Sequence, residues 1–384
     1  MWLLQIQAQT TDSSKFKSRK LTIDEINLVS SYYQQEGNNA AVTGGIGSQE
    51  LSDFSNVIDV RLVTYDKKQR KHNIGAELGI DHYTSASSDR IDLKANSSAS
   101  TADTRFYPSI SWTRDNEKKG ITTGAGLSYS GEYDYQSYGA NFLLSVKSKD
   151  RSGELTAKLQ VYLDEVTKIT PVELRSGAST LNPTYEKASR NTFAASLSWS
   201  QIINKQFQLV ILGDVIKQSG YLGLPFYRVY FNDGSVHQES LPGNRLKIPV
   251  SVRGSYFLGD KIILRAYYRF YTDNWGVTSN TASLEVPVKL TPFVSISPYY
   301  RYYDQSSAKY FNAYRQHTNV ENYYTSNYDL SKFKSSFFGA GFRVAPPNGV
   351  LGISHVSMLE LRYGHYTKNI DMSANVVSLN IRLK

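Results

Sequence analysis

The stretch RAYYRFY at residues 265–271 decides the fold, and PYYRYYD at residues 298–304 repeats its pattern. Successive side chains of a β-strand point to opposite faces. Arg265 and Arg269 therefore share one face with two tyrosines, and the other face holds only alanine, tyrosine and phenylalanine. One face is cationic and the other is apolar, so such a strand separates two different environments.

The same alternation, with a period of two residues, runs through nearly the whole chain. Residues 155–163 place leucine, alanine and valine on one face and threonine, lysine, glutamine and tyrosine on the other. No stretch shows convincing helical periodicity, and the best helix candidate, residues 22–35, also fits a strand. The longest apolar run, FQLVILG at 207–213, falls well short of the roughly 20 residues of a membrane-spanning helix. We therefore expect an all-β protein without a helical membrane span.

The composition agrees with this class. The chain has 384 residues, with 43 lysines and arginines against 34 acidic residues, a net charge of +9 and a mean hydropathy of −0.41. Its 29 tyrosines and 26 glycines are typical of β-proteins. The absence of cysteine excludes disulfides, thiolate metal sites and cysteine nucleophiles, and it fits an exported protein.

Long and short connections alternate along the chain. Short polar turns occur near 66–71, 115–120, 147–153, 203–205, 258–260 and 290–292, and long loops near 37–53, 84–104, 167–190, 220–244 and 305–331. Three connections on the long-loop side, near 132–134, 273–275 and 368–370, are tight. Long outer loops and short periplasmic turns are typical of outer-membrane barrels, and the count gives about 16 strands, within 14–18, with both termini periplasmic.

Two other classes of protein alternate in similar ways. A soluble β-sandwich or propeller would have shorter strands, since about 5–6 residues is typical, and no blade repeat occurs. Arginine among aromatics can also bind nucleic acid, but this signal is spread over the chain and the opposite face is apolar. We predict a transmembrane, antiparallel, up-and-down β-barrel in the outer membrane whose apolar face contacts lipid and whose polar face lines the lumen. We expect no nucleic-acid partner.

The N-terminus predicts a processed leader. WLLQIQA ends in the small residue Ala8 and precedes a polar stretch, as at the end of a secretory signal peptide. We therefore assign residues 1–8 to a remnant of a signal peptide, 9–20 to a periplasmic segment and 21–384 to the barrel. The alternative is an ordinary N-terminal segment. Either way, the short distance to the first strand predicts no plug domain.

The inward-pointing charges form two predicted walls. The basic wall consists of Lys247, Arg253, Arg265, Arg269, Arg301, Arg343 and Arg362. The acidic wall consists of Asp59, Glu77, Asp81 and Asp164, with Glu154 also inward and Arg61, Arg105 and Lys158 among them. Walls of charge set ion selectivity in pores, and the larger basic wall predicts a preference for anions. The alternative is structural, because lumen arginines also pair with carboxylates such as Asp214, Glu285, Asp304 and Glu360.

The long loops hold the remaining candidates. Loop 305–331 is rich in tyrosine and asparagine, and Tyr310, Arg315, Tyr323 and Tyr324 are predicted to constrict the mouth or to bind a partner. The alternative is a loop that packs only on itself. Loop 220–244 contains NDG at 232–234, which predicts a small hairpin.

Catalytic and metal-binding patterns are weak. None of the six histidines forms an HExxH motif or a close ligand pair. SHVS at 354–357 and NDGS at 232–235 place serine near histidine or aspartate without the specificity of a catalytic triad. We predict no enzyme, no catalytic residue, no cofactor and no metal.

Four stretches resemble a large family of uncharacterised outer-membrane proteins from Bacteroidota, whose defining domain has no known function. They are SSYYQQEGNNAAVTGGIG (30–47), GYLGLPFYRVYFNDG (220–234), RLKIPVSVRGSYFLGD (245–260) and YYTSNYDLSKF (323–333). The resemblance extends from about residue 20 to the end and implies an outer-membrane barrel of a Gram-negative bacterium. It implies no catalytic residue and no ligand. The terminal Lys384 departs from the aromatic residue that ends many such barrels.

The function predicted from the sequence is a porin-like channel for passive diffusion of small hydrophilic, anionic solutes. The alternative is a closed barrel that serves as a scaffold or docking partner for envelope proteins through its outer loops. An open lumen favours the channel, and a lumen sealed by loop 305–331 favours the scaffold. The sequence shows no interface that would decide the oligomeric state.

Overall fold

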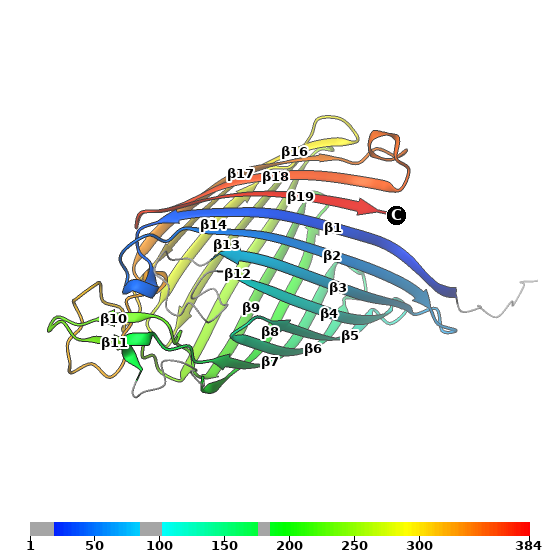
Figure 1. The fold of residues 1–384 in the computed structure, drawn as a ribbon. Coiled ribbons are helices and arrows are strands. Elements are labelled where there is room, and N and C mark those ends of the chain that lie inside the picture. The colour runs from blue at the N-terminus through cyan, green and yellow to red at the C-terminus, as the bar shows by residue number, and fades with distance from the viewer. Residues whose placement is uncertain (1–18, 85–101, 176–184) are drawn as a thin grey trace, which may run out of the picture.

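The computed structural model describes residues 19–84, 102–175 and 185–384. The predicted signal-peptide remnant, residues 1–8, and most of the periplasmic segment 9–20 lie outside these residues. The chain forms one closed antiparallel barrel, drawn in Figure 1, in which each strand pairs with the next and β1 pairs with β19. The predicted fold class is confirmed, and the ambiguous segment 22–35 lies within strand β1.

The barrel has 16 strands when β14 and β15 are counted as one interrupted strand. Their bounds are β1 (Arg19–Gly37), β2 (Leu51–Tyr65), β3 (Lys71–Thr84), β4 (Ala102–Asn116), β5 (Ile121–Gly131), β6 (Tyr135–Lys147), β7 (Gly153–Thr167), β8 (Lys187–Asn204), β9 (Phe207–Gly220), β12 (Asn244–Leu258), β13 (Ile262–Asp273), β14 (Thr278–Glu285), β15 (Val288–Lys289), β16 (Val294–Gln305), β17 (Phe333–Val344), β18 (Val356–Lys368) and β19 (Met372–Leu383).

The interruption between β14 and β15 has a local cause. Pro287 has no N–H group, so it cannot donate to the neighbouring strand. Its carbonyl still accepts from the backbone N–H of Ile263 at 3.0 Å, and the N–H of Val286 donates to the carbonyl of Pro298 at 3.0 Å. The two short strands therefore occupy a single position in the ring, between β13 and β16.

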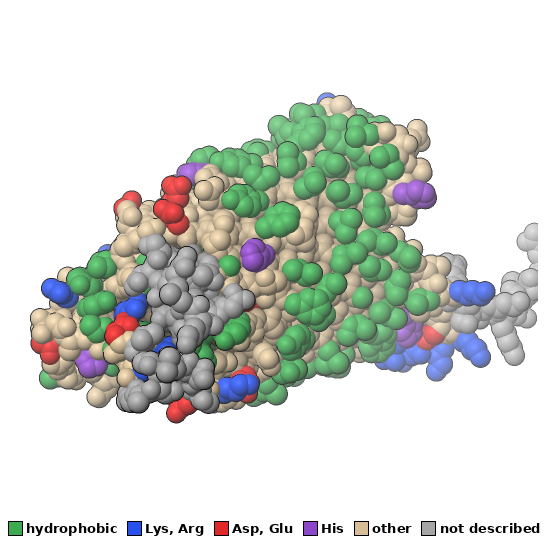
Figure 2. All heavy atoms as spheres, viewed as in Figure 1, with side chains coloured by type: hydrophobic (Ala, Val, Ile, Leu, Met, Phe, Trp, Pro, Cys, Tyr) green, Lys and Arg blue, Asp and Glu red, His purple; other side chains and the backbone are tan. Residues whose placement is uncertain are grey.

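The outer wall of the barrel is apolar. Exposed side chains alternate along the strands, as in β12, where Leu246, Ile248, Val250 and Val252 are all exposed. On the face shown in Figure 2, hydrophobic side chains cover the wall and charged ones gather toward the two ends. An apolar band of this kind is the surface that the lipid chains of a bilayer require. Closure of the barrel leaves no strand edge unpaired, so the backbone hydrogen bonds are satisfied without water. No helix in the described part of the chain is long and apolar enough to cross a membrane.

The buried apolar side chains lie at the rim and in the loops rather than in the middle of the barrel. Among the described residues, Trp275, Ile169, His317 and Val229 are the largest fully buried side chains, and all four lie in connections or in the small hairpin at the long-loop end. This hairpin pairs β10 (Arg228–Tyr230) with β11 (Val236–Gln238). It confirms the hairpin predicted around residues 232–234.

The long loops meet over one end of the barrel. We call the described residues 38–50, 168–175, 221–243 and 306–332 the cap; these loops gather beyond the strand ends in Figure 1. Arg228 Nη1 donates to the carbonyl of Val42 at 3.1 Å. The loops carrying these two residues follow β1 and β9, which are eight steps apart in the ring of 16 strands, so they start from opposite sides of the rim.

Further contacts join the other cap loops to this pair. Arg228 also forms an ion pair with Glu173, in the short helix η2 (Val172–Leu174). The backbone N–H of Asn232 donates to the carbonyl of His317 at 3.0 Å, which brings in the loop between β16 and β17. All four loops therefore belong to one packed unit over the mouth.

The opposite end of the barrel carries mostly short turns, as predicted. The exception is the connection 345–355, which includes the short helix η4 (Val350–Gly352) and was not predicted. Its residue Leu351 has a positive φ of 53° and is almost fully exposed. The β1 start and the C-terminal end of β19 lie at this same end, in the periplasm by the predicted orientation (Figure 1).

Candidate functional site

The predicted basic wall lies on the inner face of consecutive strands. Lys247 and Arg253 belong to β12, Arg265 and Arg269 to β13, Arg301 to β16, Arg343 to β17 and Arg362 to β18. Each alternates with exposed apolar neighbours such as Phe270, Phe342 and Leu361, so these basic side chains point into the barrel. Because the five strands are neighbours in the ring, with only β14 between them, the residues form one continuous surface.

Two of these arginines are joined by carboxylates. Arg265 Nη1 lies 3.1 Å from Glu285 Oε2, and Arg362 Nη1 lies 3.3 Å from Glu285 Oε1. Arg362 Nε also lies 2.5 Å from Glu360 Oε1. This chain of ion pairs runs along the inner wall from β13 to β18. The structural role weighed for lumen arginines therefore applies to Arg265 and Arg362, which have acidic partners.

The other five basic residues have no ion-pair partner among the described residues: Lys247, Arg253, Arg269, Arg301 and Arg343. The guanidinium carbons of Arg253 and Arg301 lie 5.7 Å and 5.3 Å from the ring centres of Tyr267 and Phe337. Arg269 Nε is buried and has no hydrogen-bond partner within the described chain. Aromatic rings hold these cations in place without neutralising them, so the wall keeps a positive charge.

The lumen beside the ion pairs is hollow. Although Arg265 and Arg362 point inward, their side chains are 46 % and 47 % exposed. A cavity of about 340 Å³ lies against the same wall and is lined by Glu285, Tyr299 and Phe337 together with Arg362. Side chains in a filled core would be almost completely buried, so water has access to this level of the barrel.

The predicted acidic wall is held by neutral donors. Asp81 accepts from Ser55 Oγ at 2.5 Å and from Tyr107 Oη at 2.8 Å. Asp164 accepts from Tyr135 Oη and Ser137 Oγ, both at 2.7 Å.

The two other acidic residues are placed similarly on the inner face. Asn27 Nδ2 donates a weak hydrogen bond of 3.5 Å to Asp59 Oδ1. Glu77 is exposed to the lumen. The four carboxylates do not come together in one cluster. One suggested partner of the lumen arginines is misplaced, because Asp304 alternates with inward Tyr303, faces outward and pairs with Lys334 at 3.6 Å.

The predicted loop residues lie in the cap. Tyr310 packs edge-on against Trp275 and Tyr323, at 6.0 Å and 5.7 Å between ring centres. Tyr324 packs against Phe231 at 4.9 Å. These contacts join loop 306–332 to its neighbours, so the loop does not pack only on itself.

Arg315 is an exposed residue of the cap and has a positive φ of 59°. Its backbone N–H donates to the carbonyl of Tyr230 at 3.1 Å. Of the four predicted loop residues, Arg315 and Tyr323 are therefore the ones whose side chains a partner outside the cap can reach.

The NDGS stretch forms a polar turn rather than a triad. Ser235 Oγ donates to Asp233 Oδ1 at 2.7 Å and lies 3.1 Å from His237 Nε2. In a catalytic triad the histidine lies between the serine and the acid, whereas here the serine lies between the other two. The backbone N–H of Ser235 also donates to Asp233 at 2.9 Å, as in an Asx turn.

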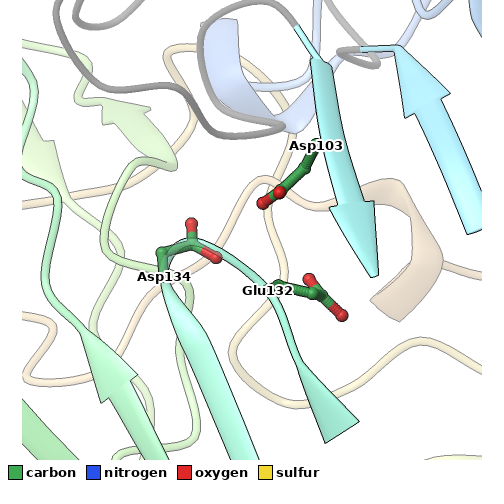
Figure 3. A group of neighbouring side chains, drawn as sticks. All are labelled: Asp103, Glu132 and Asp134. Atoms are coloured by element: carbon green, nitrogen blue, oxygen red, sulfur yellow. The ribbon is translucent and has the colours of Figure 1, made fainter. Parts of the chain in front are cut away.

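One group that sequence reasoning missed lies on the inner side of the outer rim. Asp103, at the start of β4, and Glu132 and Asp134, in the tight connection between β5 and β6, place carboxylate oxygens within 4.8 Å of one another (Figure 3). Among the described residues this is the only group of acidic, histidine or cysteine side chains with the spacing of metal ligands. Alternation from the inward Arg105 would have placed Asp103 on the inner face. This signal was missed because residues 84–104 were predicted to be a loop.

Comparisons with known proteins give a family and a set of similar shapes. The profile of the family "Protein of unknown function (DUF3570)" matches residues 67–369. No curated protein sequence matches the chain.

Similar solved structures include the ferric enterobactin receptor PfeA from Pseudomonas aeruginosa, in a mutant form, at 13 % identity and a TM-score of 0.46, covering 90 % of this chain and 53 % of that one. They also include OccK2 (OpdF) from Pseudomonas aeruginosa, at 9 % identity and 0.43, covering 94 % and 97 %. A BenF-like porin from Pseudomonas fluorescens Pf-5 has 10 % identity and 0.42, covering 94 % and 98 %. The chain spans about half the length of the receptors. At these identities and TM-scores, none of their activities is transferred to this chain.

Proposed function

We propose that the barrel is an outer-membrane channel for passive diffusion of small hydrophilic solutes, with a preference for anions. The chain belongs to the DUF3570 family, whose proteins have no known function, so the proposal rests on the barrel itself. The observation that carries the proposal is the exposure of inward-pointing arginines. Arg265 and Arg362 are nearly half exposed although they face the inside of the barrel. A water-accessible charged wall is what a diffusing ion needs.

The membrane location rests on the outer surface. A closed barrel with an apolar band and polar ends is stable in a bilayer, since all strand hydrogen bonds are made within the barrel. Barrels of this kind with an even number of antiparallel strands and long loops at one end are typical of bacterial outer membranes. We extend the proposal to a Gram-negative cell, with the cap outside and the short turns in the periplasm.

The preference for anions follows from the ion pairs. Five basic residues of the C-terminal wall have no acidic partner within the described chain, whereas Glu285 and Glu360 are both occupied by arginine. Uncompensated positive charge on a low-dielectric wall raises the local concentration of anions and lowers that of cations. Arg253 and Arg301 lie in one row across the sheet, because both are in register with β13 and β14 residues that face each other: Tyr267 and Ser283.

The cap favours the second candidate function, a closed barrel that serves as a scaffold or docking partner. Its loops meet across the mouth, and Arg315 and Tyr323 are presented on its outer side. A partner protein would bind the cap loops, and the barrel would act as an anchor. The two functions differ in one measurable property, because only a channel passes ions.

The test is conductance of the purified, folded protein in a planar bilayer under a KCl gradient. We expect steady conductance with a reversal potential on the chloride side. The double variant Arg253→Ala/Arg301→Ala should move the reversal potential toward potassium. A control with two outward charges removed, Lys187→Ala/Lys217→Ala, should leave it unchanged, since these lysines alternate with inward residues of β8 and β9. Folded protein without conductance would refute the channel and favour the scaffold.

A further inference from the structure

The acidic group at the outer rim lies where two elements meet inside the barrel mouth. Asp103 is the second residue of β4. Glu132 and Asp134 flank Tyr133 in the connection from β5 to β6. Figure 3 shows the carboxylates of Asp103 and Asp134 turned toward one another, with Glu132 beside them. Asp103 and Asp134 are only 6 % and 8 % exposed. Three negative charges are therefore held close together in a largely buried position.

Two of the three carboxylates accept hydrogen bonds from described residues. Asp103 accepts from the backbone N–H groups of Thr104 at 2.7 Å and of Tyr133 at 3.3 Å. Glu132 accepts from Tyr83 Oη at 2.6 Å and lies 3.6 Å from Arg105 Nε. Arg105 is thus a cation at the edge of the group, in contact with one carboxylate, and it also donates to Ser130 at 2.9 Å.

Asp134 is the independent sign of a missing ligand. No other described residue donates a hydrogen bond to its carboxylate, although the residue is more than nine-tenths buried. Buried carboxylates are normally paired or bind a metal, because removing an isolated charge from water is very costly. Asp134 therefore lacks the partner that a buried carboxylate normally has.

The group also has room for water or an ion. A cavity of about 340 Å³ is lined by Glu132 and Asp134 on one side and by the cap residues Leu224 and Tyr227 on the other. A bound ion could complete its coordination with waters from this space. The cavity extends under the 221–243 loop, so an ion here would lie at the joint between the rim and the cap.

We propose that Asp103, Glu132 and Asp134 bind a calcium ion. The donors are all oxygen, which selects hard cations over zinc or copper. Two carboxylates come from one short irregular connection and one from a strand, an uneven arrangement that suits the flexible coordination of calcium better than the strict octahedron of magnesium. The ion connects β4 to the β5–β6 connection and braces the rim below the cap. This site is separate from the charged walls and stands whether or not the barrel conducts.

The test is calcium binding by the purified full chain in detergent at about pH 8 after chelation, followed by calorimetry and thermal unfolding. We expect a single calcium site with a Kd on the order of 10⁻⁴–10⁻³ M, as in extracellular modules, and a rise in Tm with calcium. Asp134→Asn should weaken binding at least tenfold. The same variant should be at least as stable as the wild type without calcium, because it removes one of three like charges.

The matched control is Asp150→Asn, which alters a carboxylate in the exposed turn at the other end of the barrel. It should bind calcium as the wild type does. Asp103→Asn gives a second reading if Asp134→Asn does not fold. Absence of calcium binding and of calcium-dependent stabilisation up to about 10 mM, well above the Kd expected for such sites, would overturn the proposal. Equal affinity of Asp134→Asn and the wild type would overturn it as well.

Discussion

Glu285 is the residue whose removal most sharply tests the channel. It lies between Arg265, at 3.1 Å, and Arg362, at 3.3 Å, on the water-accessible wall. Glu285→Gln keeps the size of the side chain and a carbonyl oxygen for one of the two arginines, but it removes one negative charge. Arg362 keeps its ion pair with Glu360, so the wall gains one unit of positive charge that a passing ion meets.

The size of the effect follows from Coulomb's law. A unit charge about 5 Å from an ion in water contributes about 0.8 kcal/mol, and screening in 0.1 M salt reduces this to about 0.5 kcal/mol. Such an energy raises the local anion concentration about twofold and lowers that of cations about twofold, so the permeability ratio of chloride to potassium should rise about fivefold. In 1 M salt the Debye length is about 3 Å, and the rise should shrink to less than about twofold.

The assay is the reversal potential in a planar bilayer, measured for wild type and variant at low and high KCl concentration. The matched control is Glu165→Gln, which makes the same change on the outer face of β7, where Glu165 pairs with Lys187. The control should behave as the wild type. An unchanged ratio for Glu285→Gln at low salt, or a change toward potassium, would show that ions do not pass this wall and would refute the reasoning.

Three further predictions concern the rim and the cap. Arg245→Met should lower the free energy of unfolding by about 3–5 kcal/mol, because Asp273, whose side chain is fully buried, loses its contacts to Arg245 at 2.9 Å and 2.5 Å; adding Asp273→Asn should recover part of the loss in a denaturant titration. Glu239 is buried in the cap, and burial raises its pKa from 4.5 to about 7, so its contribution to stability is complete below pH 4.5 and is lost as the pH rises through 7. That loss is about 3 kcal/mol, and Tm measured against pH should fall less steeply for Glu239→Gln; an identical slope would contradict the assignment. Arg228→Ala removes the contacts to Glu173 and to the opposite loop, and it should speed proteolysis of the cap without changing the unfolding of the barrel; unchanged cleavage would mean that the cap is held elsewhere.

The strands could be predicted from the sequence because each one separates lipid from the lumen. This constraint acts on every residue, so the period of two in segments such as 155–163 and 265–271 is unbroken, and the alternation of loop lengths gives the strand count. The NDG hairpin was predictable for a similar local reason, since the turn type demands those residues. Pro287 is visible in the sequence. That β14 and β15 on its two sides share one position in the ring could not be predicted without knowing the neighbouring strands.

The contacts between charged groups could not be predicted in the same way. Parity indicates that Glu285 and Arg362 both point inward, yet they belong to strands separated by β16 and β17. Whether they meet depends on the register of every intervening pair and on the curvature of the wall. The contact of Arg228 with Val42 is harder still, because irregular loops carry no period that relates one side of the rim to the other. Asp304 is a different case: alternation from the inward Arg301 already places it on the outer face, so its assignment to the lumen was an error of parity and not a limit of the sequence.

We expect the pairing pattern to leave a transverse field across the lumen. On the C-terminal side, Glu285 and Glu360 are occupied by arginines, and the remaining basic residues keep their charge. On the N-terminal side, Asp81 and Asp164 are bonded by serine and tyrosine hydroxyls, which stabilise a carboxylate without cancelling its charge. We therefore expect the two walls to remain opposite in sign. In such a field a solute that carries both an anionic and a polar end should turn its anion toward the β12–β18 wall, so the barrel is expected to select solutes by the arrangement of their charge as well as by its sum.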